Sequence, residues 1–446
     1  MVPRHYWPLR LFILLSLVGC TALPISLEDA TQPGVKTPVP EDGSTSYPII
    51  NATPVPGATS ETPDTTSPVT TQFVRVWLPP EFDPDRNSAA NELLKARLNQ
   101  FEAMHPGIQL EVRMKALDGP GGMLDSLVAT SAAAPDSLPD LVLLPRPLLE
   151  SAALKGLLYP FDGLTNLMED KVWFEYALQL AHLKASTYGI PFAGDIMVLA
   201  RVLSGLESTP LSLEDAITQG GTLLYPAADP QSLFTLCMYL AEGGRLQDNQ
   251  GRPLLEETPL LNVLDYVQQA SLSEVMPYTL TQYSDDSQVW EALLAGQGPM
   301  AVTWASSYMR EDQVEQANLA MAALPTPDGV PFTLAIGWSW ALAGRDSARR
   351  DTAVQLAEFM VEKSFMADWT ESSGYMPPRV DALQEWPMTP VRQVIEQVSY
   401  SAWLAPSEDI LSTIGPVLRA AVMDVLTGLS DANVAAKAAV GQVNQP

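Results

Sequence analysis

The hydrophobic pattern of this chain changes period repeatedly from residue 73 onward. In Ile108–Met114, apolar and polar residues alternate, which predicts a half-buried strand. Leu94, Leu98 and Phe101 recur instead at helical spacing, which predicts an amphipathic helix. Strand and helix patterns follow one another as far as residue 343, and from Ser347 the pattern is almost entirely helical. We therefore predict an α/β protein with largely parallel sheets.

One stretch, Tyr188–Ala200, stands at the centre of this pattern. Ile190 precedes a proline, which favours extended backbone, and Ile196–Ala200 is a short apolar run typical of a buried strand. We predict that one strand ends before Gly194, that the chain turns there, and that a second strand begins after Asp195. Such a turn is either a hinge between two lobes or an ordinary loop within one domain.

Length and charge limit the possible classes of protein. The chain has 446 residues, more than one ordinary hydrophobic core accommodates, so we expect two lobes or domains. Its formal net charge is −27, which excludes nucleic acid and acidic membrane surfaces as electrostatic partners.

The first 20 residues have the layout of an export signal. Arg4, His5 and Arg10 precede the apolar segment Leu11–Val18, which is too short to span a bilayer. The sequence Leu-Val-Gly before Cys20 resembles a bacterial lipobox, so we predict a lipoprotein signal peptide over residues 1–20 with lipid on Cys20. The alternatives are an uncleaved anchor, or a standard signal peptide in which this cysteine is incidental.

A change of composition separates this signal from the folded body. Residues 21–72 are rich in Thr, Pro and Ser and poor in large apolar side chains, so we predict a disordered stalk that ends before Phe73. The second of the two cysteines, Cys237, lies in an apolar helical pattern. We expect a buried, unreactive thiol there in preference to a reactive one.

The sequence carries no catalytic or metal-binding motif. Spacings typical of zinc ligands, of serine hydrolases and of dinucleotide-binding loops are all absent from it. After the signal, only His105 and His182 remain as histidines, and for His182 we expect a structural role. We therefore predict no cofactor, no metal and no catalytic residues, although a carboxylate pair placed by the fold would leave no signature in the sequence.

Aromatic residues are the remaining candidates for a functional site. Trp304, Trp338, Trp340 and Tyr375 all fall at predicted strand ends or in loops near Gly and Pro. Any one of them is explained by core packing. As a set, they suit a cleft that stacks on the apolar faces of a sugar or a similar small solute.

Seven short motifs occur in the order in which one known family has them. They are Phe101–Ile108, Leu138–Val142, Gly156–Asp162, Tyr188–Phe192, Ala295–Val302, Pro325–Gly329 followed by Gly337 and Trp338, and Gly374–Arg379. In these motifs the chain resembles the family 1 extracellular solute-binding proteins of ABC importers, the maltose-binding type. It departs from the family pattern after the hinge strand, where Ala200–Leu203 replaces Tyr-Asn-Lys, and at Ile336, which replaces a glycine.

The resemblance implies an α/β, two-lobed, periplasmic-binding-protein-like (type II) fold with the ligand cleft between the lobes. It assigns residues 73–190 and 333–382 to lobe 1, and residues 195–330 and 384–446 to lobe 2.

The resemblance also implies ligand-binding roles for five residues of this chain. Asp195 would accept hydrogen bonds from solute hydroxyls, and Trp304 would be a stacking platform. Gly337 and Trp338 would line the cleft, and Tyr375 would lie at its rim.

The function implied is that of a lipid-anchored receptor on the extracytoplasmic face of a bacterial cell membrane. It would act as a monomer and deliver a small solute, a carbohydrate by preference, to the permease subunits of an ABC importer. Two alternatives stay open: a secreted lipoprotein enzyme acting on carbohydrate, and a sensor of the same fold without transport.

Overall fold

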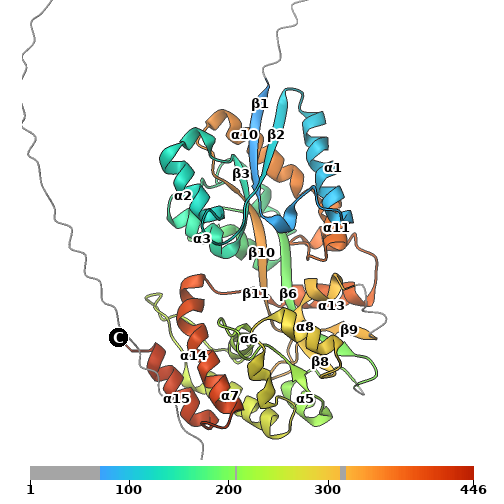
Figure 1. Ribbon diagram of the computed structural model, residues 1–446, viewed down its shortest axis with the longest axis vertical. Coiled ribbons are helices and arrows are strands. Elements are labelled where there is room, and N and C mark those ends of the chain that lie inside the picture. The colour runs from blue at the N-terminus through green and yellow to red at the C-terminus, as the bar shows by residue number, and fades with distance from the viewer. Residues whose placement is uncertain (1–70, 206–207, 312–317, 446) are drawn as a thin grey trace, which may run out of the picture. The chain divides into compact units, whose positions relative to one another are not determined.

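The computed structural model describes residues 71–205, 208–311 and 318–445 of the chain (Figure 1). The predicted signal peptide, Cys20 and nearly all of the predicted stalk lie outside these residues. The described residues belong to one compact unit, residues 66–446. Within them, no helix is both long enough and apolar enough to cross a membrane.

Most strands of the described residues join in one mixed sheet. The strands are β1 (Gln72–Leu78), β2 (Ile108–Met114), β3 (Leu141–Pro145), β4 (His182–Leu183), β5 (Ser186–Thr187), β6 (Ile190–Val202), β7 (Leu223–Leu224), β8 (Met300–Trp304), β9 (Leu319–Ala322), β10 (Thr333–Leu342) and β11 (Ala402–Leu404). The sheet has the order β2-β1-β3-β10-β6-β8-β7, with β11 added to β10 and β9 added to β6, while β4 and β5 pair separately.

Helices follow most of the strands, as the alternating pattern predicts. The α-helices are α1 (Ala89–Met104), α2 (Met123–Ala133), α3 (Arg146–Leu154), α4 (Glu175–Ala181), α5 (Leu213–Gln219), α6 (Leu233–Ala241), α7 (Glu257–Leu272), α8 (Asp286–Leu294), α9 (Ala305–Met309), α10 (Ser347–Met360), α11 (Lys363–Ser373), α12 (Val380–Leu383), α13 (Pro390–Tyr400), α14 (Glu408–Leu426) and α15 (Ala432–Val443). Short 3₁₀ turns are η1 (Pro80–Phe82), η2 (Pro135–Ser137), η3 (Leu167–Glu169) and η4 (Tyr278–Gln282).

The two long strands β6 and β10 connect two lobes (Figure 1). The first lobe contains β1, β2 and β3, and the second contains β7, β8 and β9. The pairs β1–β2, β1–β3, β7–β8 and β10–β11 are parallel, whereas β6 and β10 run antiparallel to each other and to the strands β3, β8 and β9 beside them. The prediction of largely parallel sheets was therefore wrong, because strands that cross between lobes in opposite directions make the sheet mixed. The predicted residue ranges of the lobes stay a prediction.

Strand β6 corrects a second expectation. The predicted turn at Gly194 does not exist, since the backbone is extended without interruption from Ile190 to Val202. Residues 190–196 pair with β10, and residues 197–202 pair with β8 and β9, so a single strand belongs to both lobes. Gly194 serves a different purpose, because a Cβ at this position would overlap the hydroxyl of Tyr176 from α4.

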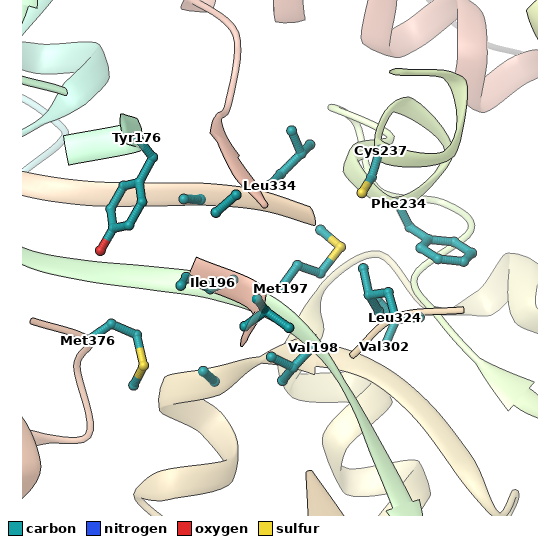
Figure 2. Packing of buried hydrophobic residues seen from close by; sticks show 14 of the residues in the cluster. Tyr176, Ile196, Met197, Val198, Phe234, Cys237, Val302, Leu324, Leu334 and Met376 are labelled. Atoms are coloured by element: carbon teal, nitrogen blue, oxygen red, sulfur yellow. The ribbon is translucent and has the colours of Figure 1, made fainter. Parts of the chain in front are cut away.

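Apolar side chains fill the space on both sides of β6 where the lobes meet (Figure 2). Cys237 is fully buried and unpaired in this core, as predicted. Burial raises the pKa of its thiol, which keeps the reactive thiolate form scarce. Met376, from the segment after α11, forms a bridge to Gly194 and adds backbone pairing beside β6 at the junction.

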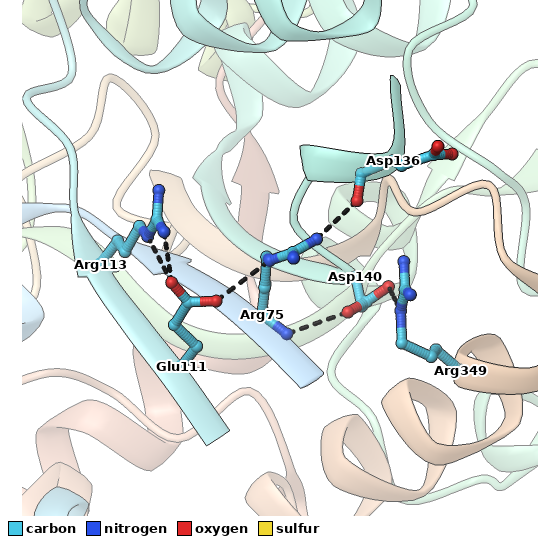
Figure 3. Close-up of polar contacts among 6 residues, drawn as sticks. All are labelled: Arg75, Glu111, Arg113, Asp136, Asp140 and Arg349. Atoms are coloured by element: carbon cyan, nitrogen blue, oxygen red, sulfur yellow. Dashed lines mark hydrogen bonds and ion pairs between the residues drawn. The ribbon is translucent and has the colours of Figure 1, made fainter. Parts of the chain in front are cut away.

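A buried carboxylate holds the first lobe together. Asp140, just before β3, is 2% exposed and accepts hydrogen bonds from the backbone amide of Arg75 in β1 and from the guanidinium of Arg349 in α10, each at 2.9 Å (Figure 3). The guanidinium of Arg75 also forms an ion pair with Glu111 of β2, with Nε and Oε2 3.0 Å apart. The network therefore fixes two strands and one helix relative to β3.

Two further expectations from the sequence concern the C-terminal helical region and His182. Strand β11 lies within the region predicted to be nearly all helical. His182 has the structural role we expected, since its Nδ1 lies 2.7 Å from the carbonyl oxygen of Leu178 and its Nε2 lies 3.2 Å from the hydroxyl of Thr187.

Candidate ligand-binding site

Three of the predicted site residues point to one face of the sheet where the lobes meet. Side chains alternate between the faces of a strand, and residues directly opposite each other on paired strands share a face. The register places Ala193 opposite Trp338, Asp195 opposite Ile336, and Met197 opposite Trp304. Asp195, Trp338 and Trp304 therefore leave the sheet on the same side.

The opposite face is covered by α4. A Cβ added to Gly337 would lie 2.6 Å from a methyl carbon of Leu180 in that helix and 2.7 Å from the carbonyl oxygen of Ala193. Gly337 is needed for this close packing, and the face with the tryptophans is the one left for a ligand.

A cavity of about 320 Å³, which we call the junction cavity, lies between the end of β3 and strand β11. It is lined by residues of both lobes and by the middle of β10: Pro145, Arg146, Pro147, Gln231, Leu233, Trp304, Ile336, Gly337, Trp338, Leu404, Ala405, Pro406 and Leu411. Its walls are mainly apolar with a few polar side chains, which is typical of sites for small molecules.

A second cavity, of about 300 Å³, shares Leu233 and Trp304 with the junction cavity. We call it the acidic cavity, because Asp229, Asp285 and Asp286 line it together with several hydroxyl side chains. Trp304 is partly exposed and borders both cavities.

Hydrogen bonds fix the position of Trp304. Its backbone amide donates to Oδ1 of Asp286 at 3.2 Å, and the hydroxyl of Ser307 donates to Oδ2 of the same carboxylate at 2.5 Å. Burial raises the pKa of Asp286, and the hydrogen bond from Ser307 opposes this rise.

Asp195 is buried and has protein partners on both carboxylate oxygens. Its Oδ1 accepts from the amides of Ile196 and Ser306 at 2.9 and 3.1 Å, and its Oδ2 accepts from the hydroxyl of Ser306 at 2.5 Å. Burial raises its pKa to about 6, although Ser306 and the charge of Arg310 act in the other direction. Asp195 lines neither of the two cavities, and its role as a hydrogen-bond acceptor for solute stays a prediction.

Tyr375 lies apart from the tryptophans of the junction cavity. Its ring stacks on that of Phe82 with centroids 5.6 Å apart, and Phe82 meets Trp338 edge-on at 4.9 Å. The structure therefore brings Trp304, Gly337 and Trp338 to one cavity and leaves Tyr375 on the far side of Phe82, where it lines a different cavity with Arg310. Trp340, the fourth aromatic candidate, is 1% exposed and belongs to the core.

Several lining residues were missed by sequence reasoning. Arg146 borders the junction cavity and donates from Nη1 to the carbonyl oxygens of Gln179, Leu180 and His182 at the end of α4. Gln231 lies in the turn before α6, and only the fold brings it to the cavity. Residues at helix starts and in turns have no periodicity that would reveal them as lining residues. Among the described residues, no group of three or more His, Cys, Asp or Glu side chains could hold a metal ion.

Comparison with protein families gives one match, to the family described as "Bacterial extracellular solute-binding protein", over residues 96–392 of the 446. No curated protein is significantly similar in sequence to this chain.

Solved structures are similar in fold. The sugar-binding protein MalE of Xanthomonas citri has a TM-score of 0.69 and 17% identity, with 83% of this chain and 96% of that protein covered. The cyclic α-maltosyl-1,6-maltose binding protein of Arthrobacter globiformis has a TM-score of 0.69 and 16% identity, with coverages of 84% and 98%. The GacH receptor of Streptomyces glaucescens, crystallised without ligand and with acarbose, has a TM-score of 0.63 and 16% identity, with coverages of 83% and 97%. These matches confirm the predicted two-lobed fold.

Proposed function

Because the chain belongs to the bacterial extracellular solute-binding protein family, we propose that it binds a saccharide between its two lobes. The observation that carries the proposal is the position of Trp304, which borders two adjoining cavities and shares a sheet face with Trp338. Indole rings stack well on the apolar faces of sugar rings, and the hydroxyls and carboxylates around them supply hydrogen-bond partners. Proteins of similar fold are named for binding sugars, one of them a cyclic maltosyl-maltose.

The residues around the junction cavity also suggest how a bound solute would change the arrangement of the lobes. Arg146 and Trp338 approach it from the first lobe and the central strand, while Gln231, Leu233 and Trp304 approach it from the second lobe. A solute held by both sets interacts best with a closed arrangement and therefore shifts the population toward it. A membrane permease that recognises the closed form would then receive loaded receptor in preference to empty receptor.

Anchoring and transport complete the proposal. The lipobox-like sequence before Cys20 supports attachment to the extracytoplasmic face of the cell membrane by lipid. Delivery to the permease subunits of an ABC importer is supported by the family of the chain. As a receptor and not an enzyme, the protein would release its solute chemically unchanged.

Calorimetric titration of the chain with maltotriose, other neutral oligosaccharides and acidic oligosaccharides tests the proposal. We expect saturable binding of at least one of them, strong weakening by Trp304→Ala, and partial retention by Trp304→Phe, which keeps an aromatic face. Absence of binding to every saccharide tested, or conversion of a saccharide into products, would contradict the proposed function.

A further inference from the structure

A third cavity lies beyond Phe82, on the side of Tyr375. Its volume is about 540 Å³, and we call it the arginine cavity because Arg86 and Arg310 both line it. Arg86 comes from the first lobe, just before α1, whereas Arg310 follows α9 in the second lobe. Phe82 contacts an aromatic ring that lines each cavity, Tyr375 of this one and Trp338 of the junction cavity.

Both guanidinium groups have N–H donors available for a ligand. Arg310 donates from Nε to the carbonyl oxygen of Ser373 at 2.7 Å, and its guanidinium carbon lies 4.1 Å from the ring centroid of Tyr375, which holds the group over the cavity. Arg86 is exposed, and its side chain makes no ion pair or hydrogen bond with any residue that the structure describes. A guanidinium carries five N–H donors and no acceptor, so each group is suited to an anionic oxygen.

The start of α1 adds further donors at the same place. Ser88 caps the helix by accepting from the amide of Asn91 at 3.3 Å, which leaves the amides of Ala89 and Ala90 without intrahelical partners. The N-terminus of a helix of 16 residues favours negative charge through its dipole. Ala90 and Asn91 both line the cavity.

Charge distinguishes this cavity from its surroundings. Two arginines and one carboxylate, that of Glu81, line it in a chain whose net charge is −27, whereas three aspartates and no Lys, Arg or His line the acidic cavity. We propose that the arginine cavity binds an oxyanion, and that this oxyanion is the carboxylate, sulfate or phosphate group of an acidic saccharide. The assignment of the group to a saccharide rests on the proposed function, whereas the binding of an oxyanion does not.

Three probes distinguish the possible sources of the oxyanion: trigalacturonate, maltotriose as its neutral counterpart, and inorganic sulfate. Binding to the mature chain is measured by calorimetry at low and high NaCl concentration. We expect trigalacturonate to bind more tightly than maltotriose, with an affinity that falls as salt rises. Arg86→Gln and Arg310→Gln should each weaken trigalacturonate binding about tenfold or more, because hydrogen bonds to charged groups are among the strong ones. Glu81→Gln should strengthen it.

Controls separate loss of the site from loss of the fold. Arg345→Gln removes an exposed arginine that lines none of the three cavities and should leave all affinities unchanged. Arg86→Gln removes no hydrogen bond within the described residues, so its melting temperature should equal that of the wild type and keep the test valid even if Arg310→Gln unfolds.

Each outcome decides one of the two proposals. Sulfate binding that depends on Arg86, without preference for trigalacturonate, would keep the oxyanion site and overturn its assignment to a saccharide. A second outcome is that maltotriose binds while Arg86→Gln changes the affinity for neither trigalacturonate nor sulfate. This result would overturn the oxyanion site and leave the proposed function intact. Failure of every saccharide, with sulfate still bound through Arg86, would contradict the proposed function alone.

Discussion

Replacing Asp195 by asparagine should remove a specific pH dependence of stability. The carboxyl is buried where the lobes meet, and burial raises its pKa to about 6 from an ordinary value of 3.8. Between these pH values the folded chain binds more protons than the unfolded chain, so the free energy of unfolding falls as pH rises from about 4 to about 6. The difference between the pKa values of Asp195 in the folded and unfolded chain corresponds to about 3 kcal/mol of stability, which is present at about pH 4 and lost above pH 6.5.

Asparagine keeps the hydrogen bonds of Asp195 while removing its titration. Its carbonyl oxygen can accept from the amides of Ile196 and Ser306, and its amide group can donate to the hydroxyl of Ser306. We therefore expect wild type and Asp195→Asn to be about equally stable at pH 4, and the variant to be more stable by about 3 kcal/mol at pH 7.

Urea unfolding of both proteins at half-unit pH intervals from 4 to 7.5 measures this difference. Ser306→Ala removes one donor to the carboxylate and should move the loss of stability to higher pH. The exposed Asp328→Asn controls for the general effect of removing a negative charge. Parallel pH profiles for wild type and Asp195→Asn would refute the reasoning.

Four other predictions concern single residues. Trp304→Ala should weaken saccharide binding by about 1–3 kcal/mol if the ring stacks as aromatic side chains do on bases, with little change in melting of the unliganded chain. Trp338→Ala should lower both affinity and stability, because Trp338 also packs edge-on against Phe82, and calorimetry with and without ligand separates these effects. Asp140→Ala should lower the free energy of unfolding by about 3 kcal/mol, since it leaves the amide of Arg75 without its acceptor and Arg349 with only the more exposed Asp346 as an ion-pair partner. Denaturation with no measurable change would contradict the role given to Asp140. Cys20→Ser should abolish incorporation of labelled lipid, and persistent labelling would show that lipid is attached elsewhere.

The order of strands and helices was largely predictable, because buried strands and amphipathic helices impose periods on the sequence. The path of β6 was not. Gly194 permits a turn, and a pattern of apolar residues does not reveal that one strand pairs with β10 in its first half and with β8 and β9 in its second. The glycine is instead explained by the approach of Tyr176, a contact between segments far apart in the sequence.

The tryptophans of β10 show a similar limit. Trp338 and Trp340 are two residues apart and should share a face of a regular strand. The pairing of β10 with β6 shifts register between Trp338 and Ser339, and Trp340 packs in the core against Phe192 while Trp338 stays at the junction cavity. The extra residue lies in β6, so both rings stay on one face of β10, where Phe82 contacts Trp338 and Phe192 contacts Trp340. Position along the strand decides which ring borders the site, because Trp338 pairs with the last residue of β3 and Trp340 with the middle of that strand. Nothing in the sequence indicates where β3 ends against β10.

The aromatic candidates came from composition and from the family resemblance, but the charged ones did not. Arg86 and Arg310 lie outside any periodic pattern, and they line one cavity only because the start of α1 and the end of α9 meet there. The sequence therefore predicted stacking residues and left the charge of the site to the structure.

The distance between the lobes, measured with and without saccharide, tests the central claim most directly. Leu154 of α3 and Leu272 of α7 are exposed side chains in the first and second lobes. Cys237 is too buried to compete for a label, and Cys20→Ser removes the other cysteine. Spin labels at Leu154→Cys and Leu272→Cys should report a shorter distance as saccharide is added, saturating at one equivalent. A distance that stays constant while saccharide binds, or that changes only as the saccharide is consumed, would contradict a receptor that closes around its solute.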